Sequence, residues 1–213
     1  MAEVDIMNTA LAAIGQEPVA DLSAPSLAGS IAATKLLRSI ETSRSVVLRR
    51  HGWLCALEYA TLAPATIAGY VNWRYPGVFL VPGASLRVWE IEGCSFNLLL
   101  LGGWGPRWQV GSTEVSGAAQ IIIRSAGCPP SLNIAYVRLA DWAALDAHVC
   151  DAIAADLAAR GCYSVTGDKA QADRLVKWAE QQVLLAISVE AAEEGGQPPL
   201  QISIPALIRR LSR

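Results

Sequence analysis

The sequence predicts an α+β protein whose two ends are helical and whose middle is an antiparallel β region. Apolar residues recur at spacings of three and four up to about residue 52 and again after residue 139, as in amphipathic helices. Between these segments, alternating β-forming residues are separated by Gly and Pro. We therefore expect a four-helix module from residues 1–52 and 139–194, an inserted antiparallel β-sandwich or barrel-like domain over 53–138, and an extended C-terminal arm over 195–213.

The first two helices are predicted from apolar spacing and from the residues that end them. Residues 4–14 carry one apolar face, and Gly15 follows as a stop signal. A longer helix is expected from about residue 27 to residue 50. Gly52 comes after it and fits the left-handed conformation that commonly closes a helix.

The β region is predicted from short runs of β-branched and aromatic residues. All but one of the seven tryptophans lie in or beside it, so we expect it to have a core of its own. Seven strands are expected, at residues 53–59, 78–81, 85–91, 96–101, 108–110, 120–124 and 133–137.

Two further helices are predicted after Asp141. One apolar stripe runs from Trp142 to Leu157, and we expect Gly161 to end that helix. A second stripe runs from Ala172 to Ile187, so the two helices should form a hairpin that turns at residues 161–167.

The last segment is predicted to be a docking arm. Pro198 and Pro199 cannot continue a helix and favour an extended chain. The residues beyond them are apolar and basic, a combination that suits strand addition or insertion into a partner's groove. We expect four apolar side chains to be buried there and two arginines to meet acidic groups: Ile202, Ile204, Leu207, Ile208, Arg209 and Arg210.

Catalytic, metal and cofactor sites are not predicted. The five cysteines have no CxxC spacing, so we interpret them as reduced core thiols. His51 lies at a helix end, and His148 and Cys150 point away from each other on a helix, so both histidines are interpreted as structural. Gly102, Gly103 and Gly105 lack the GK[ST] of a phosphate loop; Trp104 between them either contacts a partner or is tucked into the β core.

One carboxylate pair leaves an enzymatic alternative open. Glu90 and Glu92 share one face of a predicted strand, as a glycosidase pair would. A two-residue spacing on an edge hairpin more often marks a solvent face. A peptidoglycan hydrolase is therefore retained only as the alternative.

Charge is segregated along the chain. Basic residues outnumber acids in residues 26–52, and acids outnumber bases in residues 139–194. The two helical halves are complementary and are expected to pair within one bundle or across a subunit boundary. The whole chain is slightly acidic and has no recognised nucleic-acid-reading motif. No run is long enough to span a membrane, and the acidic N-terminus is unlike a secretory signal, so we expect a soluble protein made in the cytoplasm.

Four stretches resemble the tail tubular protein A family, the head-to-tail adaptor or gatekeeper proteins of short-tailed phages. Three are VDIMNTALAAIGQEPVADL, with its Asn, Ile-Gly and Pro-Val; RRHGWLCALEYATLAP, with its Gly-Trp; and YPGVFLVPGASLRVWEI, with its Leu-Arg-Val. The fourth is the acidic, Ala-rich pair of helices over 139–194. Together they cover most of residues 3–194 in the family's order.

The resemblance implies a structural virion protein and no enzymatic activity. It implies a homo-oligomeric ring, commonly of twelve copies, that binds the portal protein above and the tail nozzle protein below, with tail fibres at its flank. Double-stranded DNA would pass through without specific binding. Such a ring needs a heterologous interface, for which Arg38 and Arg44 are predicted to face Asp146 and Asp156. The loop that carries Trp104 would face the tail, and the arm would dock on the portal or on a neighbouring subunit.

Overall fold

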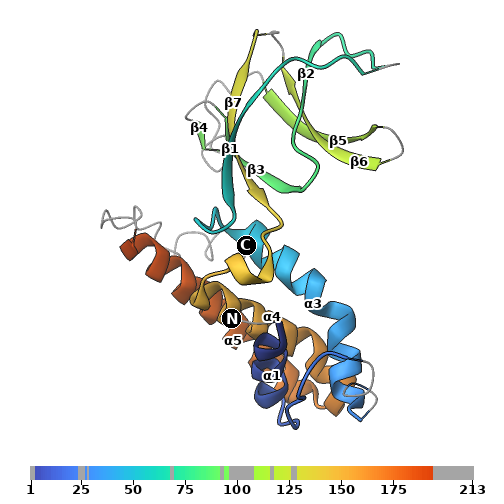
Figure 1. Cartoon of the computed structure of the whole chain (residues 1–213), viewed down its shortest axis with the longest axis vertical. Helices are drawn as coiled ribbons and strands as arrows, with labels where there is room; N and C mark the ends of the chain where they lie inside the picture. The colour runs from blue at the N-terminus through green and yellow to red at the C-terminus, as the bar shows by residue number, and fades with distance from the viewer. Residues whose placement is uncertain are drawn as a thin grey trace, which may run out of the picture.

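The computed structural model describes residues 3–193, apart from 24–26, 28, 68–69, 92–93, 96–107, 116–117 and 126–128. It is α+β, with the helices at one end of the molecule and the strands at the other (Figure 1). The strand expected at 96–101, Trp104 and the arm over 195–213 lie outside the described residues. The helices are α1 (Glu3–Ala13), α3 (Ile31–Arg50), the short 3-10 helix η2 (Trp142–Ala144), α4 (Ala147–Thr166) and α5 (Lys169–Glu193).

The helical part is organised around α4, which packs against α1, α3 and α5. Its Ala-rich sequence lets the neighbouring helices approach closely, because five of its eleven buried positions are alanine or glycine. One apolar cluster joins α1, α3 and α4 around Leu36, Ile40 and Leu157. A second cluster reaches from Ile153 of α4 towards the strands and includes Trp53.

The helix ends follow local rules at three positions. Ser30 caps α3, its hydroxyl accepting a hydrogen bond from the Ala33 amide at 3.2 Å. Gly15 after α1 and Gly167 after α4 both have positive φ, 73° and 72°, the conformation that glycine adopts without strain. Gly15 was expected to end the first helix, and that prediction is confirmed.

Two predictions about glycines are wrong. Gly161 does not end its helix, because α4 continues to Thr166. A side chain at Gly161 would instead collide with Leu36 of α3, so the glycine permits two helices to touch. Gly52 does not adopt the left-handed conformation either; α3 ends at an extended His51, and Gly52 has a different role at the junction with the strands.

The described strands form two antiparallel sheets. The first has the order β1-β7-β3-β4, from β1 (Leu57–Leu62), β7 (Leu132–Arg138), β3 (Ser85–Ile91) and the two-residue β4 (Cys94–Ser95). The second has the order β2-β6-β5, from β2 (Gly77–Leu80), β6 (Ala118–Ser125) and β5 (Trp108–Val115).

An apolar cluster lies between the two sheets. The first sheet contributes alternate residues such as Ile134 and Tyr136, and the second contributes Phe79 and Ile123. The β region therefore has an apolar cluster of its own, as expected, but among the described tryptophans only Trp108 packs against it. β1 begins four residues later than expected, because Trp53 is buried against the helices and a turn follows it.

Candidate functional site

The junction between the helical part and the strands concentrates the polar and aromatic contacts of the described chain. Its centre is Trp53, which is fully buried and donates a hydrogen bond from Nε1 to the Val47 carbonyl of α3 at 3.0 Å. The preceding Gly52 lies under the indole of Trp89 on β3; a Cβ at Gly52 would come within 2.6 Å of that ring. Only glycine allows β3 to lie this close to the end of α3.

Three further contacts fasten β3 and α5 to the same point. Arg87 of β3 donates to the Arg49 carbonyl at the end of α3, at 3.0 Å. Glu190, near the end of α5, is buried and accepts a hydrogen bond from the Leu54 amide through Oε1. Its Oε2 lies 3.2 Å from Nε2 of His51. We name His51, Gly52, Trp53, Trp89 and Glu190 the junction cluster.

The junction cluster is suited to holding elements together and not to nucleophilic chemistry. Burial raises the pKa of the adjoining Cys55 thiol from 9.0 to about 11. A backbone hydrogen bond at Asp146 acts in the opposite direction, and the charges of Asp146 and Glu190 raise the pKa further. The thiol is therefore protonated at neutral pH and is a poor nucleophile. His148 lies near Trp53, with ring centroids 6.3 Å apart, and its Nε2 is buried without a hydrogen-bond partner among the described residues.

The loop after α1 is held by a side-chain clamp. Asn8 of α1 accepts a hydrogen bond from the Val19 amide at 2.8 Å and donates one to the Val19 carbonyl at 2.9 Å. Gly15 reverses the chain so that Val19 can return to the helix. The Asn, the Ile-Gly and the Pro-Val of this segment thus together hold the loop against α1.

The four predicted interface residues have different surroundings. Arg44 is buried within the chain: it pairs with Glu41 at 2.6 Å, and its guanidinium carbon lies 4.4 Å from the centre of the Trp142 ring. Asp156 is also buried, between Arg160 at 2.5 Å and Arg50 of α3 at 4.0 Å. Here a basic residue of α3 and an acidic residue of α4 meet within one chain.

Arg38 and Asp146 differ from that pair. Both side chains are exposed, and neither has an ion-pair partner among the described residues. Asp146 precedes α4 and lies beside Cys55. Of the four predicted residues, these two remain available to a second chain.

The helical part also exposes apolar side chains. Ile31 of α3 is 76% exposed, and Tyr163 of α4 is 62% exposed. On α5, Val176, Leu184 and Leu185 are each about half exposed. These exposed side chains are available for contacts with another protein.

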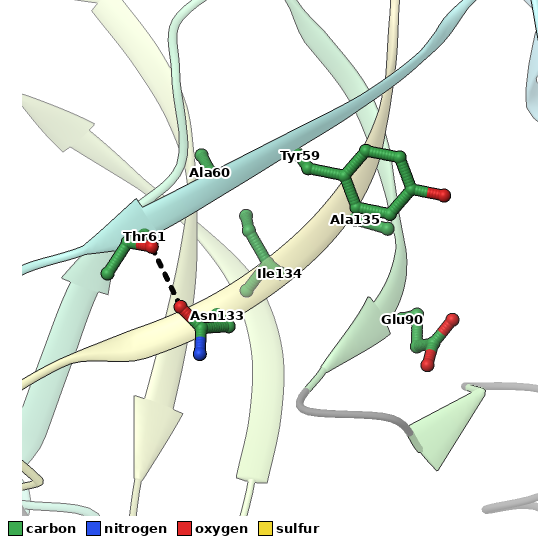
Figure 2. Close-up of a pocket in the computed structure, with 7 residues that line it drawn as sticks. All are labelled: Tyr59, Ala60, Thr61, Glu90, Asn133, Ile134 and Ala135. Atoms are coloured by element: carbon green, nitrogen blue, oxygen red, sulfur yellow. Dashed lines mark hydrogen bonds between the residues drawn. The ribbon is translucent and has the colours of Figure 1, made fainter.

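A shallow groove lies on the first sheet, with a volume of about 370 Å³ (Figure 2). Tyr59 and Thr61 of β1, Asn133 and Ala135 of β7 and Glu90 of β3 line it, and the Thr61 hydroxyl donates to Asn133 Oδ1 at 2.7 Å. Figure 2 shows the Glu90 carboxylate apart from the other polar groups. Glu92, the predicted partner of Glu90 in a hydrolase, lies outside the described residues.

Sequence reasoning missed several of these residues. Glu190 continues the buried stripe of Ala179, Val183 and Ala186 on α5, and an acid on such a stripe is a signal that could have been noticed. The pairing of Gly52 with Trp89 had no such signal, because it joins residues from two different elements. Among the described residues, no group of three or more His, Cys, Asp or Glu side chains could hold a metal ion, and no described helix is long and apolar enough to cross a membrane.

Compared with known proteins, the chain matches no family model, and no curated protein is significantly similar to it.

Proposed function

We propose that this chain is a structural protein of a phage virion, a subunit of the ring that joins the portal of the head to the tail. In this proposal the portal protein lies above the ring, and the tail nozzle protein lies below it, with tail fibres at the flank. The genome passes through the centre without sequence-specific contacts, which suits a chain with a small negative net charge.

The observation that carries the proposal is the junction cluster. Two of the stretches that resemble tail tubular protein A meet there: the Gly-Trp stretch supplies Gly52 and Trp53, and the Leu-Arg-Val stretch supplies Arg87 and Trp89. Residues that carry the resemblance thus interact with one another across the fold. This convergence is the support that we take from the structure for the proposal.

The arrangement of the helices and the two sheets supports the same proposal. We infer that α1, α3, α4 and α5 act as one four-helix module and that the two sheets act as an inserted sandwich, fixed to the module at the junction cluster. A ring subunit needs two unlike faces in a fixed relation, because each face meets a different face of the next copy. A buried tryptophan and a buried glutamate at the joint supply that rigidity.

The exposed side chains suggest where neighbours bind. Arg38 on α3 and Asp146 before α4 are candidates for charge contacts between subunits, whereas Arg44 and Asp156 support the fold of one subunit. Val176, Leu184 and Leu185 on α5 offer exposed apolar area on the same helical part. The arm over 195–213 is proposed to dock on the portal or on the adjoining subunit.

The proposal is tested by measuring mass. The purified chain is mixed with the portal protein encoded in the same genome, and the complex is weighed by native mass spectrometry. We expect the portal ring to gain about twelve copies of the 22.6 kDa chain. A portal ring that gains no mass would contradict the proposal, and clearing of peptidoglycan in a zymogram would favour a tail-associated hydrolase in its place.

A further inference from the structure

The connection between β1 and β2 presents two large apolar side chains to solvent. Val71 is 93% exposed and Trp73 is 91% exposed, the two highest values among the large apolar residues described. A tryptophan is rarely left in water over its whole ring, because burying it removes a large apolar area from solvent. This position therefore points to a second surface that covers it.

The turn that carries Trp73 is held in shape by its own polar groups. Asn72 Oδ1 accepts hydrogen bonds from the amides of Arg74 and Tyr75, at 3.1 and 3.0 Å. The Tyr70 hydroxyl donates to the Tyr75 carbonyl at 3.0 Å. Because the turn is organised before it meets a partner, little ordering is left to oppose binding. We name residues 70–76 the aromatic turn.

The aromatic turn and the groove lie on opposite sides of the β region. The turn is next to the second sheet, since the Arg124 guanidinium of β6 lies 6.0 Å from the Tyr70 ring. The groove lies on the first sheet, where Tyr59, Thr61, Asn133 and Ala135 alternate along β1 and β7 with core residues such as Ile134 (Figure 2). Figure 1 shows β2, β5 and β6 on one side of this region, and β1 and β4 on the other.

The aromatic turn and the groove are complementary in size and charge. The groove volume of about 370 Å³ falls within the range of roughly 300–1,000 Å³ found for sites that enclose a small molecule, so an indole ring can enter it. Tyr59 offers an aromatic wall that is itself 77% exposed. At its side, Glu90 has no ion-pair partner among the described residues, and neither has the exposed Arg74 next to Trp73.

We propose that the aromatic turn of one copy docks into the groove of the next copy, with Trp73 against Tyr59 and Arg74 beside Glu90. Both partners belong to one domain and lie on opposite sides of it, so the contact is head-to-tail and repeats around a ring. The inference rests on the proposed ring and identifies the surface through which its subunits meet. It adds a contact in the β region to those proposed for the helices.

Cross-linking between differently tagged copies tests the contact directly. One copy carries Val71→Cys, an exposed position of the aromatic turn that leaves Trp73 in place, and the other carries Thr61→Cys, a groove residue. The mixture is oxidised and mapped by mass spectrometry. We expect a disulfide that joins the two tags. The control replaces Thr61→Cys by Ser112→Cys, an exposed position on β5 of the other sheet, for which we expect no enrichment of the mixed product.

Charge exchange provides a second test that does not depend on the tryptophan. We expect Arg74→Glu and Glu90→Arg each to weaken assembly, and the double variant to recover most of the loss. The matched control pairs Arg74→Glu with Glu114→Arg, an exposed acid on β5, and should recover nothing. Trp73→Ala should raise the dissociation constant about 30-fold or more, as expected for the centre of an interface.

The outcomes separate this inference from the proposed function. Rings that form on the portal equally well with Trp73→Ala and with either charge reversal, and without the mixed disulfide, would overturn the inference and leave the adaptor function in place. A mixed disulfide and charge rescue in a chain that never binds the portal would support the contact between copies and overturn the adaptor function. Capture of a different protein by the groove, with no effect on self-association, would also overturn the inference.

Discussion

Gly52 is the residue whose role depends most on its neighbours. The Trp89 indole occupies the space that a Cβ would need, and the same ring stacks edge-on with His51 at 5.4 Å between centroids. Sequence reasoning found the position but gave it the wrong cause, since a glycine after a helix usually marks a left-handed cap. The cause lies on β3, which is distant in sequence.

A pair of alanine substitutions tests this role. Gly52→Ala should lower the free energy of unfolding by about 1–3 kcal/mol, because Trp89 or the end of α3 must shift. Gly83→Ala is the control: nothing lies within 4 Å of a Cβ there, so its stability should be unchanged or slightly higher. Thermal unfolding of both variants measures the difference. Equal melting temperatures for the two would contradict the packing argument.

The raised pKa of the Cys55 thiol makes its contribution to stability depend on pH. Its folded pKa of about 11 exceeds the value of 9.0 expected when the chain unfolds. Folding thus favours the neutral thiol; this contribution to stability is complete below pH 9 and is lost as the pH rises towards 11. Alkylation of Cys55, followed by peptide mass mapping, should show a midpoint near 11 in the folded protein and near 9 in denaturant. A midpoint near 9 in both states would count against the buried environment.

Among the elements, α5 links the end of the chain's helical part to the start of its β region. Glu190 is 2% exposed and satisfies the Leu54 amide in the turn before β1, next to His51 at the end of α3. One side chain thereby connects three elements. The hydrogen bond is partly buried, so an amide that loses this acceptor is incompletely hydrated and lowers the free energy of unfolding.

Two substitutions at Glu190 separate hydrogen bonding from charge. Glu190→Ala should lower the free energy of unfolding by roughly 1–3 kcal/mol, because the Leu54 amide is left unpaired. Glu190→Gln keeps an acceptor oxygen and should lose less. Chemical denaturation of both variants provides the comparison. A glutamine variant as unstable as the alanine variant would indicate that charge, and not the hydrogen bond, carries the contribution.

The elements that sequence reasoning found are those with a sustained local pattern. The α+β class, the long second helix and β3 at residues 85–91 follow from periodicity alone. Gly161 was misinterpreted because a glycine's low helix propensity is a local property, and packing against Leu36 overrides it. The groove and the aromatic turn could not be predicted, since each depends on how strands pair and which side chains remain uncovered.

At the scale of the whole molecule, we propose a rigid subunit that lies between two different partners. In this proposal, head-to-tail contacts between unlike faces of successive copies close the ring, and the arm over 195–213 docks on a neighbour. Truncation after residue 194 should leave the melting temperature of the isolated chain unchanged while abolishing retention on the portal. Sedimentation of truncated and full-length chains with portal rings measures this. Full binding by the truncated chain would contradict the role of the arm.

The most direct test of the central claim is imaging of particles produced by the genome that encodes this chain. The account predicts a ring of this chain, commonly twelve copies, between the portal and the tail nozzle, with the DNA path through its centre. Finding the chain elsewhere in the particle, or absent from it, would contradict the account.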